Sequence, residues 1–189
     1  MALIFVTISS ASFAQSQCSQ NFLPAHLKAQ LLESPELQSL QQLSTQIAQR
    51  ITASDHSVFS RAFEEGNNKA VLNAIGYSEK DIASLEQRME SNSLVLFRSF
   101  PELAYFLPNS TVAAPLSGEQ IVAMASIMTD GDRSISNGSN GGVNCAWVPY
   151  TASLGLCTAA GPVMYFACAA VALCAWCSGG YVSSMCAIS

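Results

Sequence analysis

The stretch that decides the fold is CAAVALCAWCSGGYVSSMC, which runs from Cys168 to Cys186. It holds four of the seven cysteines of the chain and no charged residue. Such a segment combines the composition of a membrane-spanning helix with that of a disulfide framework. The rest of the sequence indicates whether this segment is a membrane helix or part of a disulfide-linked module.

Crowding of cysteines extends through the whole C-terminal region. Six of the seven lie in the last 45 residues: Cys145, Cys157, Cys168, Cys174, Cys177 and Cys186. This is typical of small oxidised modules in secreted proteins. Zinc binding is the alternative, but zinc sites favour histidine or paired CxxC units, and the only histidines, His26 and His56, are distant in sequence. We predict six disulfide-bonded cysteines, no metal and no cofactor; six cysteines allow 15 pairings, so the connectivity stays open.

Two apolar runs lie between these cysteines. The second, Pro162–Cys177, is apolar all round a helix and must therefore be buried in protein or in lipid. Its 16 residues would rise only about 24 Å, whereas spanning a bilayer takes roughly 20 residues. Because Gly161 and Pro162 interrupt the combined run, we expect two short helices, a hairpin that turns near Gly161. A strand-like piece should follow Gly179 and Gly180.

Four aromatic residues flank the apolar runs, at positions where aromatic side chains favour a lipid–water interface: Trp147, Tyr150, Trp176 and Tyr181. They favour a membrane-active tail that disulfides hold together in water.

Three alternatives for the tail remain open: a simple C-terminal membrane anchor, a redox-active CxxC at Cys174–Cys177, and the core of a structural secreted protein.

The region from residue 22 to residue 129 reads as several amphipathic helices. Apolar residues recur every three or four positions in the stretch PELQSLQQLSTQIAQRI, at Leu37, Leu40, Leu43, Ile47 and Ile51. Capping pairs are expected at Ser78 with Asp81 and at Ser117 with Gln120. The sequence therefore predicts a small helical bundle before the cysteine-rich tail.

Charge is confined to this helical part, because every Lys, Arg, Asp and Glu lies between Lys28 and Arg133. The net charge of −5 and the lack of a basic run give no footprint for nucleic acid. Asp55 beside His56 is the one histidine–carboxylate neighbour pair, and at a helix start it is more typical of an N-cap. None of the motifs GxSxG, HExxH, GxGxxG and the P-loop is present, so we expect no catalytic residue.

Two boundaries complete the organisation. The start, MALIFVTISSASFAQSQC, resembles a secretory signal with an apolar run and small residues, which predicts cleavage after Ala14; a short apolar strand of a cytosolic protein is the alternative. A flexible linker is predicted from Thr129 onward, in the stretch TDGDRSISNGSNGGVN. Gly141 and Gly142 in this stretch are a possible processing site. The predicted segments are a signal peptide (1–14), a helical pro-region (15–129), a linker (130–144) and a cysteine-rich apolar module (145–189).

This organisation resembles that of secreted cysteine-rich bacteriocin precursors, of the halocin type or related to fulvocin. The residues that carry the resemblance are NCAWVPYTASLGLCTAAGPVMYFACAAVALCAWCSGGYVSSMC, from Asn144 to Cys186. The chain departs from those families in having only six tail cysteines, fewer than they tend to show. The resemblance implies that the tail is released as an antimicrobial peptide that acts on target-cell membranes, with a processing protease and an immunity protein as further partners.

The sequence thus predicts a mainly α protein with a helical pro-region bundle and a C-terminal apolar hairpin stapled by disulfides. The expected function is that of a secreted, non-enzymatic toxin precursor. The alternative is an envelope-associated interaction protein whose tail is an apolar membrane anchor.

Overall fold

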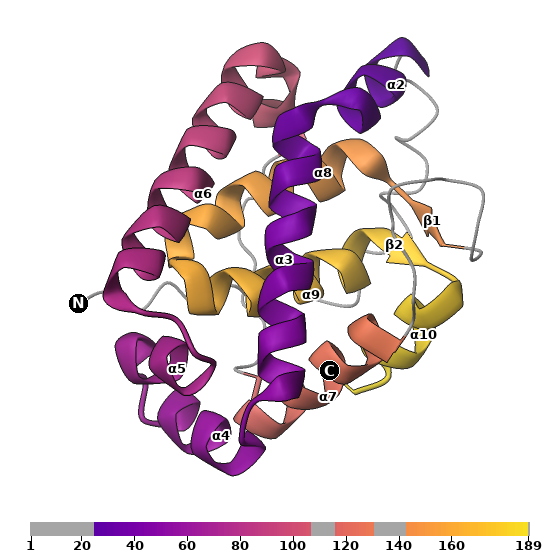
Figure 1. Cartoon of the computed structure of the whole chain (residues 1–189). Coiled ribbons are helices and arrows are strands. Elements are labelled where there is room, and N and C mark those ends of the chain that lie inside the picture. Colours follow the sequence, from indigo (N-terminus) through magenta and orange to yellow (C-terminus); the bar gives the residue numbers. More distant parts are fainter. Residues whose placement is uncertain (1–24, 107–115, 131–142, 189) are drawn as a thin grey trace.

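The computed structural model describes residues 25–106, 116–130 and 143–188. Within these ranges the chain is mainly helical, with a two-stranded sheet near the C-terminus (Figure 1), which confirms the predicted fold class. The elements are α2 (Ala25–Glu33), α3 (Pro35–Ala53), α4 (His56–Glu64), α5 (Asn68–Ala74), α6 (Glu79–Ser99), η3 (Pro101–Phe106), α7 (Gly118–Asp130), β1 (Asn144–Cys145), α8 (Trp147–Cys157), η4 (Thr158–Ala160), α9 (Pro162–Trp176), β2 (Cys177–Ser178) and α10 (Gly180–Cys186).

Helix α3 forms as its periodicity predicts. Ser34 caps it by accepting a hydrogen bond from the backbone N–H of Leu37, and Pro35 occupies the first turn, where a missing N–H costs nothing. All five of its predicted apolar positions are at most 2% exposed. The apolar stripe therefore faces the core along the whole helix.

The two predicted capping pairs are also confirmed. Ser78 and Asp81 form a capping box at the start of α6, in which each side chain accepts from the other residue's backbone N–H. Ser117 and Gln120 make the same reciprocal bonds before α7. Asp55 caps α4 by accepting from Ser57 and Val58, so its carboxylate serves the helix end as expected.

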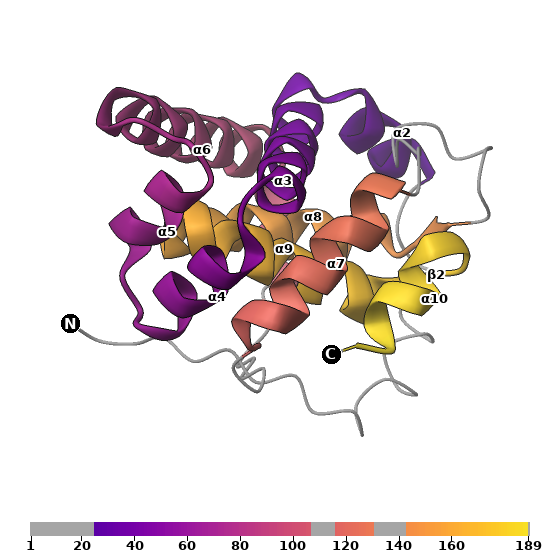
Figure 2. The same ribbon diagram turned by 60° about the horizontal axis from the view of Figure 1, so that its bottom comes forward.

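The apolar hairpin formed by α8, η4 and α9 lies inside the fold rather than beside it. Helix α3 crosses over both hairpin helices, and α6 runs along the turn (Figures 1 and 2). Helices α2 and α5 and the η3 turn close further sides, and α7 joins α3, α4 and α10. We call the described helices of residues 25–130 the sheath, because they cover the hairpin. The two predicted regions thus share one hydrophobic core.

The end of the chain differs from the sequence-based expectation. The piece after Gly179 is a short helix, α10, and not a strand. Gly179 and Gly180 both have positive φ, of 83° and 53°, so they redirect the chain sharply instead of extending it. The strand pairing lies earlier, where Asn144 and Cys145 pair antiparallel with Ser178 and Cys177.

The predicted boundaries are only partly covered by the described residues. Helix α7 continues to Asp130, one residue into the predicted linker. The expected signal cleavage at Ala14 and the possible processing site at Gly141 and Gly142 lie outside the described residues.

Candidate functional site

All six tail cysteines are paired, and the pairing follows the hairpin. Cys145–Cys177 joins the two strands at its base, Cys157–Cys168 joins α8 to α9 behind the turn, and Cys174–Cys186 fastens α10 to α9. The disulfides predicted from cysteine crowding are thereby confirmed, and the structure supplies the connectivity that the sequence left open. Each of the six described cysteines has its partner within residues 145–186, which we call the cysteine module.

The hairpin is buried on nearly every side. Tyr165 and Phe166, in the first half of α9, have no exposed surface, and neither do Ala152 and Leu154 of α8. The sequence required α9 to be buried in protein or in lipid, and in this fold the partner is protein. The sheath removes from water the apolar surface that a small stapled module would otherwise leave exposed.

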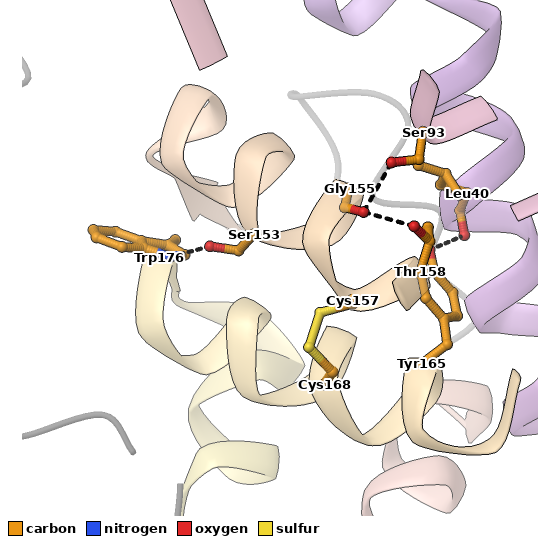
Figure 3. Close-up of a disulfide and its surroundings, with 9 residues drawn as sticks. All are labelled: Leu40, Ser93, Ser153, Gly155, Cys157, Thr158, Tyr165, Cys168 and Trp176. Carbon is orange, nitrogen blue, oxygen red and sulfur yellow. Dashed lines mark hydrogen bonds between the residues drawn. A yellow bond between two sulfur atoms is a disulfide. The ribbon is translucent and has the colours of Figure 1, made fainter. Parts of the chain in front are cut away.

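A few hydrogen bonds fix the hairpin within the sheath (Figure 3). The hydroxyl of Tyr165 donates to the backbone carbonyl of Leu40 in α3 at 2.8 Å. The hydroxyl of Ser93 in α6 donates to the backbone carbonyl of Gly155 at 3.0 Å. Neither bond involves a charge, so sheath and module are joined by apolar packing with sparse neutral hydrogen bonds.

Gly155 lets α8 approach α6 closely. A Cβ at this position would lie 2.6 Å from Cε2 and 3.1 Å from Cζ of Phe97. We predict that Gly155→Ala forces the Phe97 ring to move and lowers the free energy of unfolding by about 1–3 kcal/mol. Urea unfolding measures this change.

The matched control for this prediction is Phe97→Leu/Gly155→Ala, in which the smaller side chain makes room for the new methyl group. The double variant should lose less stability than the sum of the two single variants. Additive losses would mean that Gly155 and Phe97 do not contact each other.

Three of the four predicted interfacial aromatics, Trp147, Tyr150 and Trp176, lie at the base of the hairpin, opposite its turn, and Tyr181 lies in α10. Trp147 starts α8 and packs edge-to-face against Tyr150, with ring centroids 6.0 Å apart. Trp176 ends α9, donates through Nε1 to Ser153 Oγ at 3.0 Å, and accepts from the Ala146 backbone N–H. Trp147 and Tyr150 are buried and Trp176 and Tyr181 are half-buried, so their membrane contact stays a prediction for the separated module.

Burial also sets the ionisation of the module's tyrosines. Loss of hydration raises the pKa of Tyr165 and Tyr150 well above the usual value, and each is raised further by a neighbouring tyrosine. Burial raises the pKa of Tyr181 to about 12. All three are therefore neutral in the folded chain at any ordinary pH.

A pH prediction follows, because tyrosines in the unfolded chain lose their protons near pH 10. The free energy of unfolding should be constant up to about pH 9–10 and fall as the pH rises through the folded-state pKa values. Tyr165→Phe removes one titrating group and should make the fall shallower. Urea midpoints between pH 7 and 12 test this; an unchanged slope in the variant would contradict it.

The described residues offer little for catalysis. Among them, no group of three or more His, Cys, Asp or Glu side chains is placed to hold a metal ion. A cavity between α3 and α6 is lined by Arg50, Tyr77 and Asp81, but Arg50 lies over the Tyr77 ring and donates to the carbonyl of Gly76, at 2.9 Å. These side chains support the turn before α6.

No helix in the described ranges has both the length and the apolarity needed to span a bilayer.

Sequence reasoning missed the residues that join hairpin to sheath. Tyr165 is the only hydroxyl-bearing residue of α9, and a phenol within an otherwise apolar helix signals a buried hydrogen-bond partner. Ser93 and Phe97 carry no such signal, because their role depends on which helix lies opposite them.

Comparisons with known proteins assign neither a family nor a function to the chain. The chain matches no protein-family model, no curated protein and no solved structure.

Proposed function

We propose that this chain is the precursor of a secreted antimicrobial peptide, in which the helical sheath keeps a membrane-active cysteine module soluble and inactive. The observation that carries the proposal is the position of the module. The module is held by three disulfides. Its uncharged hairpin forms the centre of the fold, while every Lys, Arg, Asp and Glu of the chain lies outside it.

The covalent arrangement supports release. All described cysteines pair within the module, so a cut between Asp130 and Val143 would leave the described parts of sheath and module joined only by packing and hydrogen bonds. The three disulfides would remain in the released module and preserve its compact form. Disulfides are also typical of proteins outside the cytosol, in keeping with export and cleavage after Ala14.

Cleavage alone would not free the module, because separating it exposes a hydrophobic core to water. A bilayer offers the apolar surroundings that water lacks. Helix α9 has 15 residues and rises about 22 Å, less than the roughly 30 Å of a hydrocarbon core. The module would therefore insert without a stable span and perturb the target membrane, with its aromatic base at the interface.

The proposal is tested with the module obtained from folded, oxidised protein. A specific protease site replaces residues 134–140, the chain is cut there, and the fragments are separated in mild denaturant. The oxidised module should permeabilise indicator bacteria, whereas the reduced and alkylated module should not. Equal inactivity of both forms would reject the antimicrobial function.

Native processing gives a second test, on the secreted material of producing cells. Mass spectrometry should find a chain that begins at Gln15 and a C-terminal fragment lighter than its reduced form by two hydrogens per disulfide. Recovery of only full-length, membrane-bound protein would instead favour an envelope protein with a C-terminal anchor.

A further inference from the structure

The exposed side chains of the hairpin gather at its turn. Between Trp147 and Trp176, the described residues classed as exposed are four, all between 156 and 164: Leu156, Ala159, Ala160 and Met164. Leu156 and Met164 are each 40% exposed. We call residues 156–164 the tip. The most exposed side chains of the hairpin thus lie at its turn, while several others of α9, between Cys168 and Trp176, are half-buried.

The tip has almost nothing to offer a polar partner. It contains no ionisable group, and its one hydroxyl, on Thr158, donates to the carbonyl of Gly155 at 2.7 Å (Figure 3). Protein interfaces combine apolar contacts with hydrogen bonds and are enriched in aromatic residues and arginine. The described side chains of the tip offer apolar contact, including that of Met164, but no aromatic ring, no charge and no free hydrogen-bonding group, so they suit hydrocarbon better.

The tip is also held in shape. Cys157–Cys168 joins the two helices directly behind it, and Gly161 adopts a φ of 82° that other residues rarely take. At the opposite end of the hairpin lie Trp147 and Trp176. A hairpin that enters a membrane from its surface would do so with its apolar tip first, and its aromatic base would stay at the interface.

We propose that the tip is the docking surface through which the folded chain first contacts the acyl-chain region of a lipid bilayer, before the module leaves the sheath. This inference rests on the proposed function and specifies which surface of the chain contacts the membrane first. Leu156 and Met164 enter the hydrocarbon first, and the buried faces of α8 and α9 follow as they separate from α3 and α6.

The test uses the full oxidised chain and vesicles of phosphatidylcholine, and co-sedimentation measures vesicle binding. Both tryptophans of the chain lie at the end of the hairpin opposite the tip, so their quenching by brominated acyl chains reports the later insertion of the module and not the docking of the tip. Leu156→Glu/Met164→Glu should weaken vesicle binding about tenfold or more, since two apolar side chains no longer enter hydrocarbon. Leu156→Ser/Met164→Ser is the milder second variant and should weaken binding in the same direction.

The matched control is Val58→Glu, a charge placed on a side chain of α4 that is 48% exposed and belongs to the sheath. It should leave vesicle binding within about twofold of the wild type, because such a site makes no predicted lipid contact. Unchanged binding by both tip variants, or an equal loss in the control, would overturn the proposal. So would a wild-type dimer that only the tip variants dissociate, because the tip would then bind a second copy.

The two proposals fail in different ways. If the separated oxidised module kills cells but the tip variants of the full chain bind vesicles normally, the docking surface is wrong and the antimicrobial function stands. If the tip directs vesicle binding but the module never permeabilises cells, the antimicrobial function is wrong and the docking surface stands.

Discussion

Phe166→Ala is expected to lower the free energy of unfolding of the whole chain by about 3–5 kcal/mol. Phe166 has no exposed surface and lies in α9, where its removal leaves a cavity in the core that module and sheath share. Since domains of this size have roughly 5–15 kcal/mol of stability, the variant should be close to unfolding at body temperature. Far-UV circular dichroism reports mainly the sheath, and tryptophan fluorescence reports only the module.

The two signals should change together in urea, because module and sheath share one core. Met164→Ala is the matched control on the same helix, and its side chain is 40% exposed; it should cost well under about 2 kcal/mol, since little buried volume is removed. Two separate transitions, with only the fluorescence shifted by Phe166→Ala, would mean that the module folds independently.

Cys145→Ser/Cys177→Ser is expected to lower the free energy of unfolding by about 3–4 kcal/mol. The bridge closes a loop with a sequence separation of 32, and the stabilisation by a disulfide grows with the loop that it closes. Both cysteines are 8% exposed and pair across the two short strands, so the base of the hairpin should open in the variant. Urea unfolding under non-reducing conditions measures the loss.

Cys157→Ser/Cys168→Ser is the natural comparison, because this bridge has a separation of only 11. The shorter loop should make its loss smaller, by about 1 kcal/mol. Equal or reversed losses would show that native packing, rather than restriction of the unfolded chain, sets the contribution of each bridge.

Local structure was predictable where periodicity and capping decide it. Leu37, Leu40 and Leu43 repeat with helical spacing and are buried as that spacing requires. Ser78 with Asp81 marks the start of α6 from sequence alone. Pro162 after Gly161 placed the turn of the hairpin correctly, because proline suits a first helical turn and glycine allows the positive φ before it.

Long-range structure was not predictable in the same way. Six cysteines at these spacings permit many pairings, and only the folded path brings Cys145 beside Cys177. An apolar helix shows that it is buried but not by what, so the contact of Tyr165 with α3 could not be foreseen. The strand expected after Gly179 was wrong because the two positive-φ glycines favour a turn into α10.

The division of charge links the fold to the proposed function. The sheath carries all the charged side chains that the structure describes and buries most of its leucines in the core that it shares with α8 and α9, so it gives an uncharged hairpin a charged outer surface. Under the proposed function, one chain would carry a membrane-active module through water until the two parts separate.

The central claim, that the sheath masks a membrane-active module, is tested most directly by dye leakage from phospholipid vesicles. The intact oxidised chain and the oxidised module separated after cleavage between Asp130 and Val143 are compared at equal molar concentration. The account predicts leakage with the separated module and little with the intact chain. Equal leakage from both, or none from the separated module, would contradict it.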